Sequence, residues 1–195
     1  MTDSVINRIV ANPPAPGHRI SFARLDGQHR VELTDLYRDA GRVADSLRRL
    51  GLKPGDRIGI LAANSLGWVL LDLAALRAKV VTAGFEPGKF DPDPALLDRY
   101  QLAMLFTDRL TDVDAGRDPR LRPLADVMAL AREGDDREVE PVSYAPEEVT
   151  TLKFTSGSTG EPKGLAASVG SIDASLRGVQ QMFTHGPGDD IFIFL

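Results

Sequence analysis

The 195-residue sequence contains no cysteine, which excludes a disulfide framework, a thiolate metal site and a cysteine nucleophile. Positive charge is also limited, because 23 Lys and Arg stand against 28 Asp and Glu and leave a formal net charge of −5. The basic residues are scattered and form no stripe that could follow the phosphates of a nucleic acid. We therefore expect no nucleic-acid partner.

Long apolar runs are lacking as well. No uncharged stretch approaches the roughly 20 residues that a membrane helix needs, so no transmembrane segment is expected. The first ten residues lack the basic start and apolar run of a secretory signal, which favours a cytoplasmic location. The three histidines have no cysteine or second histidine at ligand spacing, so no metal ligand is assigned.

The hydrophobic pattern predicts a small antiparallel hairpin followed by a long helix. Apolar and polar residues alternate over 20–33 around Asp26-Gly27, a dipeptide that tolerates a tight turn. Helical spacing begins at Thr34, the expected N-cap, and ends before Gly51, the expected C-cap. The polar face of this helix carries Arg38, Arg42, Asp45 and Arg49.

Short apolar runs then alternate with helical patterns. Strands are predicted over 57–62, 80–83 and 103–106, and helices over 66–76, capped by Asn64 or Ser65, and over 94–100. This alternation predicts an α/β fold with a mainly parallel sheet and helices on both faces.

Regular patterns weaken over 107–148, apart from one short helical pattern at 124–131. The charged run 132–140 is expected to be a solvated loop. Beyond it we predict a strand over 149–154, a loop, a strand over 165–167 and a helix over 171–183. The apolar residues 191–195 are typical of an inner strand, so we expect the chain to be cut at Leu195.

The most informative segment is residues 155–164, Thr-Ser-Gly-Ser-Thr-Gly-Glu-Pro-Lys-Gly. Its inner glycines let the backbone approach a ligand closely, so that successive amide N–H groups can converge on an anion. Hydroxyl groups add donors, and Lys163 adds a positive charge on a stem long enough to reach the outer phosphates. We therefore predict a phosphate-binding loop. Its binding residues are expected to be Thr155, Ser156, Gly157, Ser158, Thr159, Gly160 and Lys163.

The segment is not a Walker A loop, because no Gly-Lys-Ser/Thr run follows at the required spacing, and it lacks the dinucleotide fingerprint. It closely resembles the phosphate-binding loop of the adenylate-forming superfamily: acyl-CoA synthetases, luciferases and the adenylation domains of peptide synthetases. The sequence from Leu33 to Ala78 is similar to the N-terminal helix, strand and helix of that family, in the same order. Two positions depart from the family pattern. Lys79 stands where Gly is usual, and Val169 stands where many members have His.

The resemblance implies that residues 1–195 form part of the large N-terminal AMP-binding domain of such an enzyme. We divide this part into a leading segment with the hairpin (1–33), βα units (34–106), an irregular region (107–148) and the phosphate-loop region (149–195).

The resemblance also implies a reaction. A carboxylic acid is activated with ATP as acyl-AMP, pyrophosphate is released, and the acyl group passes to a thiol. Lys163 would be the catalytic cation, and the ligands of the accompanying Mg²⁺ would lie mostly outside this chain, so the chain alone is expected to be inactive. Coenzyme A is the favoured thiol, and a carrier protein is the alternative, as in fatty-acyl-AMP ligases or peptide-synthetase adenylation domains. A non-catalytic nucleotide- or anion-binding module that natively ends at Leu195 is the alternative from another class, and the oligomeric state is left open.

Overall fold

The structure is a computed structural model that describes residues 4–24, 27–110, 118–155, 163–183, 186 and 188. Its first elements are α1 (Val5–Ala11), β1 (Arg19–Arg24), β2 (Gly27–Glu32), α2 (Leu33–Arg49), β3 (Arg57–Leu61), α3 (Leu66–Arg77) and β4 (Val81–Phe85). They are followed by α4 (Pro94–Tyr100), β5 (Met104–Thr107), β6 (Leu121–Pro123), α6 (Asp126–Glu133), a 3₁₀ turn (Asp136–Glu138), β7 (Val149–Thr155), β8 (Lys163–Ser168) and α7 (Val169–Met182). The predicted final strand over 191–195 lies outside the described residues.

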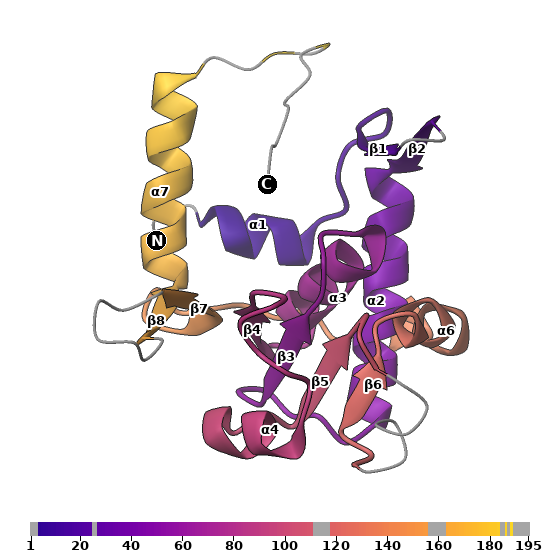
Figure 1. The fold of residues 1–195 in the computed structure, drawn as a ribbon. Coiled ribbons are helices and arrows are strands. Elements are labelled where there is room, and N and C mark those ends of the chain that lie inside the picture. The colour runs from indigo at the N-terminus through magenta and orange to yellow at the C-terminus, as the bar shows by residue number, and fades with distance from the viewer. Residues whose placement is uncertain are drawn as a thin grey trace.

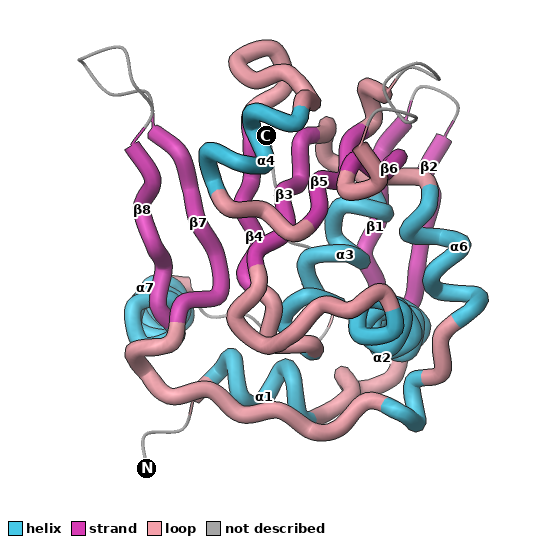
Figure 2. The backbone as a smooth tube through the Cα atoms, turned by 90° about the horizontal axis from the view of Figure 1, so that it is seen from below, coloured by secondary structure: helices cyan, strands magenta, loops and turns pink. Residues whose placement is uncertain are grey.

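A six-stranded sheet forms the centre of the fold, with the strand order β6-β5-β3-β4-β7-β8 (Figure 2). Neighbouring strands are parallel except for β7 and β8, which form an antiparallel hairpin. The predicted mainly parallel sheet is thus confirmed. β1 and β2 pair separately as the predicted antiparallel hairpin, in which Gly27 begins β2 with a φ of 135°.

Helices cover both faces of the sheet, as predicted. On one face, α2, α3 and α6 enclose a core to which Ile58 and Ile60 of β3 contribute. The next residue along β3, Leu61, points to the other face, because side chains alternate along a strand, and it packs there with Leu96 and Leu97 of α4. The sheet therefore lies between two apolar clusters, one on each of its faces.

The observed helix ends confirm one of the predicted caps and correct two. Ser65 caps α3 by accepting a hydrogen bond from the Trp68 amide at 3.3 Å. The C-cap of α2 is Leu50 rather than the predicted Gly51, which is the next residue and has a φ of 94°. Thr34 does not cap α2 either, because the helix already begins at Leu33 and its N-cap is Glu32. The Leu33 amide donates to the His18 carbonyl at 2.8 Å, so the hairpin supplies the partner of the first amide of the helix.

Three features go beyond the predicted elements. The strand β6 lies within the region 107–148 and adds a parallel edge strand beside β5. The charged run 132–140 includes a 3₁₀ turn at Asp136–Glu138. The helix α1 was not predicted, and Figure 1 shows it running between α7 and α2. Among the described residues, no helix has the length and apolar character needed to cross a membrane.

Candidate functional site

The predicted phosphate loop connects the two strands of the β7–β8 hairpin. Residues 156–162, which include Ser156, Gly157, Ser158, Thr159 and Gly160, lie outside the described part of the chain. The structure brings the two ends of the loop together, because Thr155 and Lys163 are ladder partners and Phe154 pairs with Gly164 in the same way. Lys163 is exposed at the start of β8. The loop therefore begins and ends at a single paired position at the tip of the hairpin.

The loop leaves the sheet at its carboxyl edge. β7 lies parallel to β4, with Gly84 opposite Lys153, so the segment that follows β4 emerges beside the loop that follows β7. From β3, the chain passes through α3 to β4, which lies on one side of β3. From β4, it passes through α4 to β5, which lies on the opposite side of β3, so the direction of strand order reverses. In open α/β sheets, ligands bind outside the carboxyl ends at such a reversal of strand order. The arrangement of strands favours a ligand site next to the loop.

A polar group beside β7 was missed by the sequence analysis. Asp72 of α3 accepts a hydrogen bond from the hydroxyl of Thr82 at 2.8 Å, and that hydroxyl lies 3.2 Å from the hydroxyl of Thr151. Burial raises the pKa of Asp72, and the Thr82 hydrogen bond and the charge of Lys153 act in the opposite direction. These contacts join α3, β4 and β7, and the signal in the sequence was one carboxylate in the middle of a helix that is apolar up to its last residue, Arg77.

Val169, which departs from the family pattern, has a packing role in this chain. It is the first residue of α7, and its side chain is 1% exposed. It packs in a small cluster with Ile6 and Val10 of α1 and with Tyr144. An apolar residue at this position therefore fits the helix α1, which covers it.

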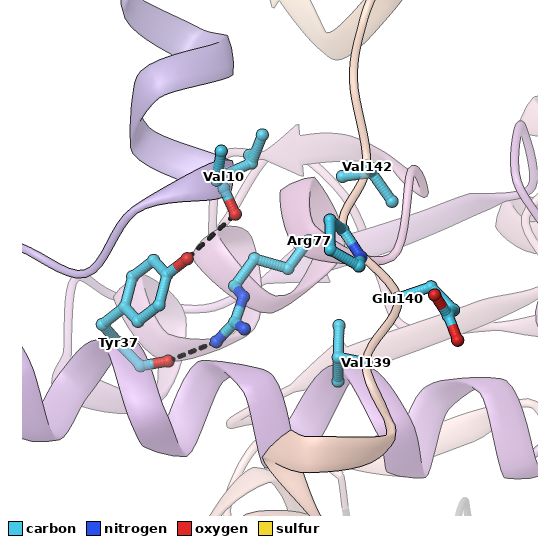
Figure 3. Close-up of a pocket in the computed structure, with 8 residues that line it drawn as sticks. Val10, Tyr37, Arg77, Val139, Glu140 and Val142 are labelled. Carbon is cyan, nitrogen blue, oxygen red and sulfur yellow. Dashed lines mark hydrogen bonds between the residues drawn. The ribbon is translucent and has the colours of Figure 1, made fainter.

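The described residues also line a partly open pocket of about 70 Å³ (Figure 3). At one side of it, Arg77 donates a hydrogen bond to the Tyr37 carbonyl at 2.6 Å and lies over the Tyr37 ring, 4.1 Å from its centre. The Tyr37 hydroxyl donates in turn to the Val10 carbonyl at 2.9 Å. Arg77 ends α3 just before β4 begins, so the pocket lies near the amino edge of the sheet, away from the phosphate loop. Its size and place suit a packing junction of α1, α2 and α3 rather than the substrate site.

Across the described ranges, no three His, Cys, Asp or Glu residues lie together as a potential metal site. The sequence analysis expected the Mg²⁺ ligands mostly outside this chain, and that expectation stays a prediction.

Comparison with known proteins identifies the family. A family model described as AMP-binding enzyme matches residues 13–195, which is most of the chain. The chain therefore belongs to the AMP-binding enzyme family, and the resemblance to adenylate-forming enzymes is confirmed.

Relatives named for different activities are similar to this chain. Feruloyl-CoA synthase from Amycolatopsis is 30% identical over 152 residues, which cover 75% of this chain and 30% of that protein. Pyochelin synthetase PchE from Pseudomonas aeruginosa is 33% identical over 159 residues, which cover 79% of this chain and 10% of that protein. The crystal structure of fatty acid AMP ligase from Legionella pneumophila has the same fold, with a TM-score of 0.72 and 21% identity over 94% of this chain and 33% of that one. The chain thus spans a third or less of the length of each of these three proteins.

Proposed function

We propose that the full-length protein activates a carboxylic acid with ATP and then transfers the acyl group to a thiol, most readily coenzyme A. The observation that carries the proposal is the Gly/Ser/Thr loop with Lys163 at its end, placed on a hairpin at the carboxyl edge of a parallel sheet. Backbone amides, hydroxyls and an ammonium group are the donors that a polyphosphate requires. Membership of the AMP-binding enzyme family supports the same assignment.

In the first step, a carboxylate oxygen attacks the α-phosphorus of ATP, and the bond to the bridging oxygen breaks as pyrophosphate leaves. In the second step, the thiol sulfur attacks the acyl carbonyl, AMP leaves and the thiol proton is released. The first step needs no general base, because a carboxylic acid is already ionised at neutral pH. The residues of this chain would instead orient the phosphates and offset the charge that develops on pyrophosphate. The phosphate oxygens would be held by Thr155, Ser156, Gly157, Ser158, Thr159, Gly160 and Lys163.

The test is acid-dependent exchange of labelled pyrophosphate into ATP by the full-length protein, with and without Mg²⁺. The panel should contain ferulic acid and other aryl acids, because one relative is a feruloyl-CoA synthase, and fatty acids, because a similar structure is a fatty acid AMP ligase. Amino acids complete the panel as a third class of carboxylic acid. Acids that support exchange are then offered with either coenzyme A or a phosphopantetheinylated carrier protein. Acyl-CoA formation supports the favoured acceptor, whereas loading of the carrier alone supports the peptide-synthetase type of reaction. Tight ATP binding without exchange for any acid would instead support a non-catalytic nucleotide-binding module.

A further inference from the structure

Four aromatic rings meet next to the base of the phosphate loop. They belong to Phe85 at the end of β4, Phe90, Tyr100 at the end of α4, and Phe154 of β7. Phe154 is the shared member: its ring lies 4.8 Å from that of Phe85 in a stacked arrangement and 4.6 Å from that of Tyr100 in an edge contact. Phe90 lies 6.1 Å from Phe154 and 5.1 Å from Phe85. We call these four residues the aromatic quartet.

The quartet lies just beyond the end of the ladder between β4 and β7. The pairing of β4 with β7 runs from Thr82 opposite Thr151 to Gly84 opposite Lys153, and Phe154 is the next residue of β7. On its other side, β7 pairs with β8, which is the outermost strand of the sheet among the described residues, where Leu165 of β8 is 58% exposed. Contacts of the Phe154 ring therefore hold the tip of the hairpin against the body of the domain.

Phe154 also fixes the strand on which the loop ends. It is the ladder partner of Gly164, and a Cβ atom added to Gly164 would lie 3.2 Å from Cε1 of the Phe154 ring. The ring therefore lies directly against the Gly164 backbone, which precludes a larger residue there without movement of the ring. The neighbouring ladder pair is Thr155 with Lys163, so the ring and the two ends of the loop are adjacent.

We propose that the aromatic quartet positions Lys163 for its contact with the phosphates of ATP, with Phe154 as the positioning residue that links the domain core to the hairpin tip. The inference rests on the proposed function and explains what would hold Lys163 in a precise position. Displacement of a catalytic group by about 1 Å can lower the rate by roughly 100-fold. Without the ring contacts, a lysine at this hairpin tip would lack that precision, because among the described residues the Lys163 backbone pairs with one strand alone.

The Tyr100 hydroxyl supports the view that the quartet acts through its rings. Its oxygen is buried and has no hydrogen-bond partner among the described residues. Burial of such a group is unfavourable, so the contacts of the Tyr100 ring must offset it. The ring contacts, rather than a polar interaction, are what this residue contributes to the base of the loop.

The test is a double-mutant cycle in the full-length protein, measured by acid-dependent pyrophosphate exchange. Phe154→Leu removes the shared ring, Lys163→Ala removes the positioned group, and the third variant combines both. We expect Phe154→Leu to lower kcat/KM for ATP by roughly 10- to 100-fold. In the Lys163→Ala background, Phe154→Leu should lower kcat/KM for ATP by less than about twofold. The ammonium group that Phe154 would position is already absent from that variant, so its displacement has no further effect.

Phe106→Leu is the matched control. Phe106 is fully buried on β5, in the cluster on the other face of the sheet, so the substitution perturbs the core without touching the quartet. It should lower the melting temperature and leave the KM for ATP unchanged. If Phe154→Leu does not fold, Phe85→Leu removes the ring stacked on Phe154 and leaves the hairpin sequence intact.

The outcomes separate this inference from the proposed function. Losses that multiply in the double variant would show that Phe154 acts independently of Lys163, which overturns the positioning role alone. A Lys163→Ala variant that exchanges pyrophosphate at the parent rate would overturn both the positioning role and the assignment of Lys163. Coupled losses together with an unchanged KM in Phe106→Leu would support the inference.

Discussion

Lys79 and Glu148 form an ion pair in which the Lys79 ammonium lies 2.6 Å from the Glu148 carboxylate. Lys79 has a φ of 55°, in the left-handed region that glycine adopts most easily, which explains why glycine is usual at this position in the family. The lysine side chain also lies over the Tyr144 ring, 5.0 Å from its centre. In this chain, the Lys79 side chain therefore makes stabilising contacts at a turn between α3 and β4 where its own backbone is strained.

This pairing predicts that Lys79→Ala is worse than Lys79→Gly. Alanine loses the ion pair and the ring contact, about 1–2 kcal/mol together, and keeps the backbone strain. Glycine loses the same contacts but relieves about 1 kcal/mol of strain. The melting temperature of the full-length protein should therefore fall in the order parent, Lys79→Gly, Lys79→Ala.

Gln101 gives the control for this prediction, because it also has a positive φ, of 53°, but forms no ion pair. Among the described residues, its side chain accepts one long hydrogen bond, of 3.5 Å, from Arg57. Gln101→Gly should thus raise the melting temperature where Lys79→Gly lowers it. Equal melting temperatures for the alanine and glycine variants at Lys79 would contradict the assignment of strain.

The elements of the fold were predictable to different degrees. Helix α2 and strand β3 followed from their periodicity, because each has one clearly apolar pattern over its full length. Asp45 was assigned to the polar face of α2, yet it is 1% exposed. It accepts a hydrogen bond from the Asp135 amide at 3.1 Å and pairs with Arg48 and Arg49. Periodicity identifies the apolar face of a helix, but it does not reveal that a later segment will cover the polar one.

In the candidate site, too, local features could be predicted from the sequence and contacts between distant segments could not. The phosphate loop could be proposed from the sequence because its residues are contiguous and their chemistry is local, and its contact with phosphate stays a prediction. The contact of Phe85 with Phe154 was not predictable, because it depends on β7 lying beside β4 after the chain has formed β5 and β6 on the far side of β3. Strand order is set by packing across the whole sheet, and no local pattern encodes it.

Asp173 joins α7 to the N-terminal helix. Its carboxylate is 4% exposed and accepts a hydrogen bond from the Ile6 amide at 3.1 Å. Burial alone would raise the pKa of Asp173, but hydrogen bonds from the Ser4 side chain and from the amides of Ile6 and Val5 outweigh it and hold the pKa below its ordinary value. The charged carboxylate is thus the form that the folded state favours.

We expect Asp173→Asn to destabilise the full-length protein by about 1 kcal/mol at pH 7, because hydrogen bonds to a neutral acceptor are weaker. The folded pKa lies below the unfolded one, so the stabilisation is fully present above about pH 4 and is lost as the pH falls through the folded pKa. Urea unfolding of the parent and the variant at several pH values measures this difference. Asp35→Asn, at a half-exposed pair with Arg38, should have little effect at any pH. A difference for Asp173→Asn that persists unchanged below the folded pKa would contradict the prediction.

Two glycines should respond to alanine in opposite directions. A Cβ atom at Gly134 would collide with the carbonyl group of Arg42 in α2 and lie 2.8 Å from the Ser46 hydroxyl. Gly178, inside α7, has no neighbour within 4 Å of an added Cβ. Gly134→Ala should therefore lower stability by about 1–3 kcal/mol, and Gly178→Ala should raise it by about 0.5–1 kcal/mol. Thermal unfolding of the two full-length variants measures these changes. A higher melting temperature for both variants would contradict the close packing at Gly134.

Lys163→Ala in the full-length protein should slow the adenylation step specifically. A charge-assisted hydrogen bond contributes roughly 1.5–3 kcal/mol, which corresponds to about a 10- to 150-fold loss of rate or affinity. The transfer step, started from supplied acyl-AMP and the thiol, should change much less, because pyrophosphate takes no part in it. Quenched single-step assays that measure the rates of adenylation and of acyl transfer separately would reveal this difference.

Lys153→Ala is the matched control for this prediction, because Lys153 is also an exposed lysine of the hairpin but lies on β7 two residues before the loop, where its ladder partner is Leu165. It should leave both half-reactions near the parent rate. A protein that is merely destabilised would lose both half-reactions together, and the loss would be accompanied by a lower melting temperature. If Lys163→Ala slows both steps equally, or adenylates as fast as the parent, Lys163 does not contact the phosphates and the loop must bind them through its amides and hydroxyls alone.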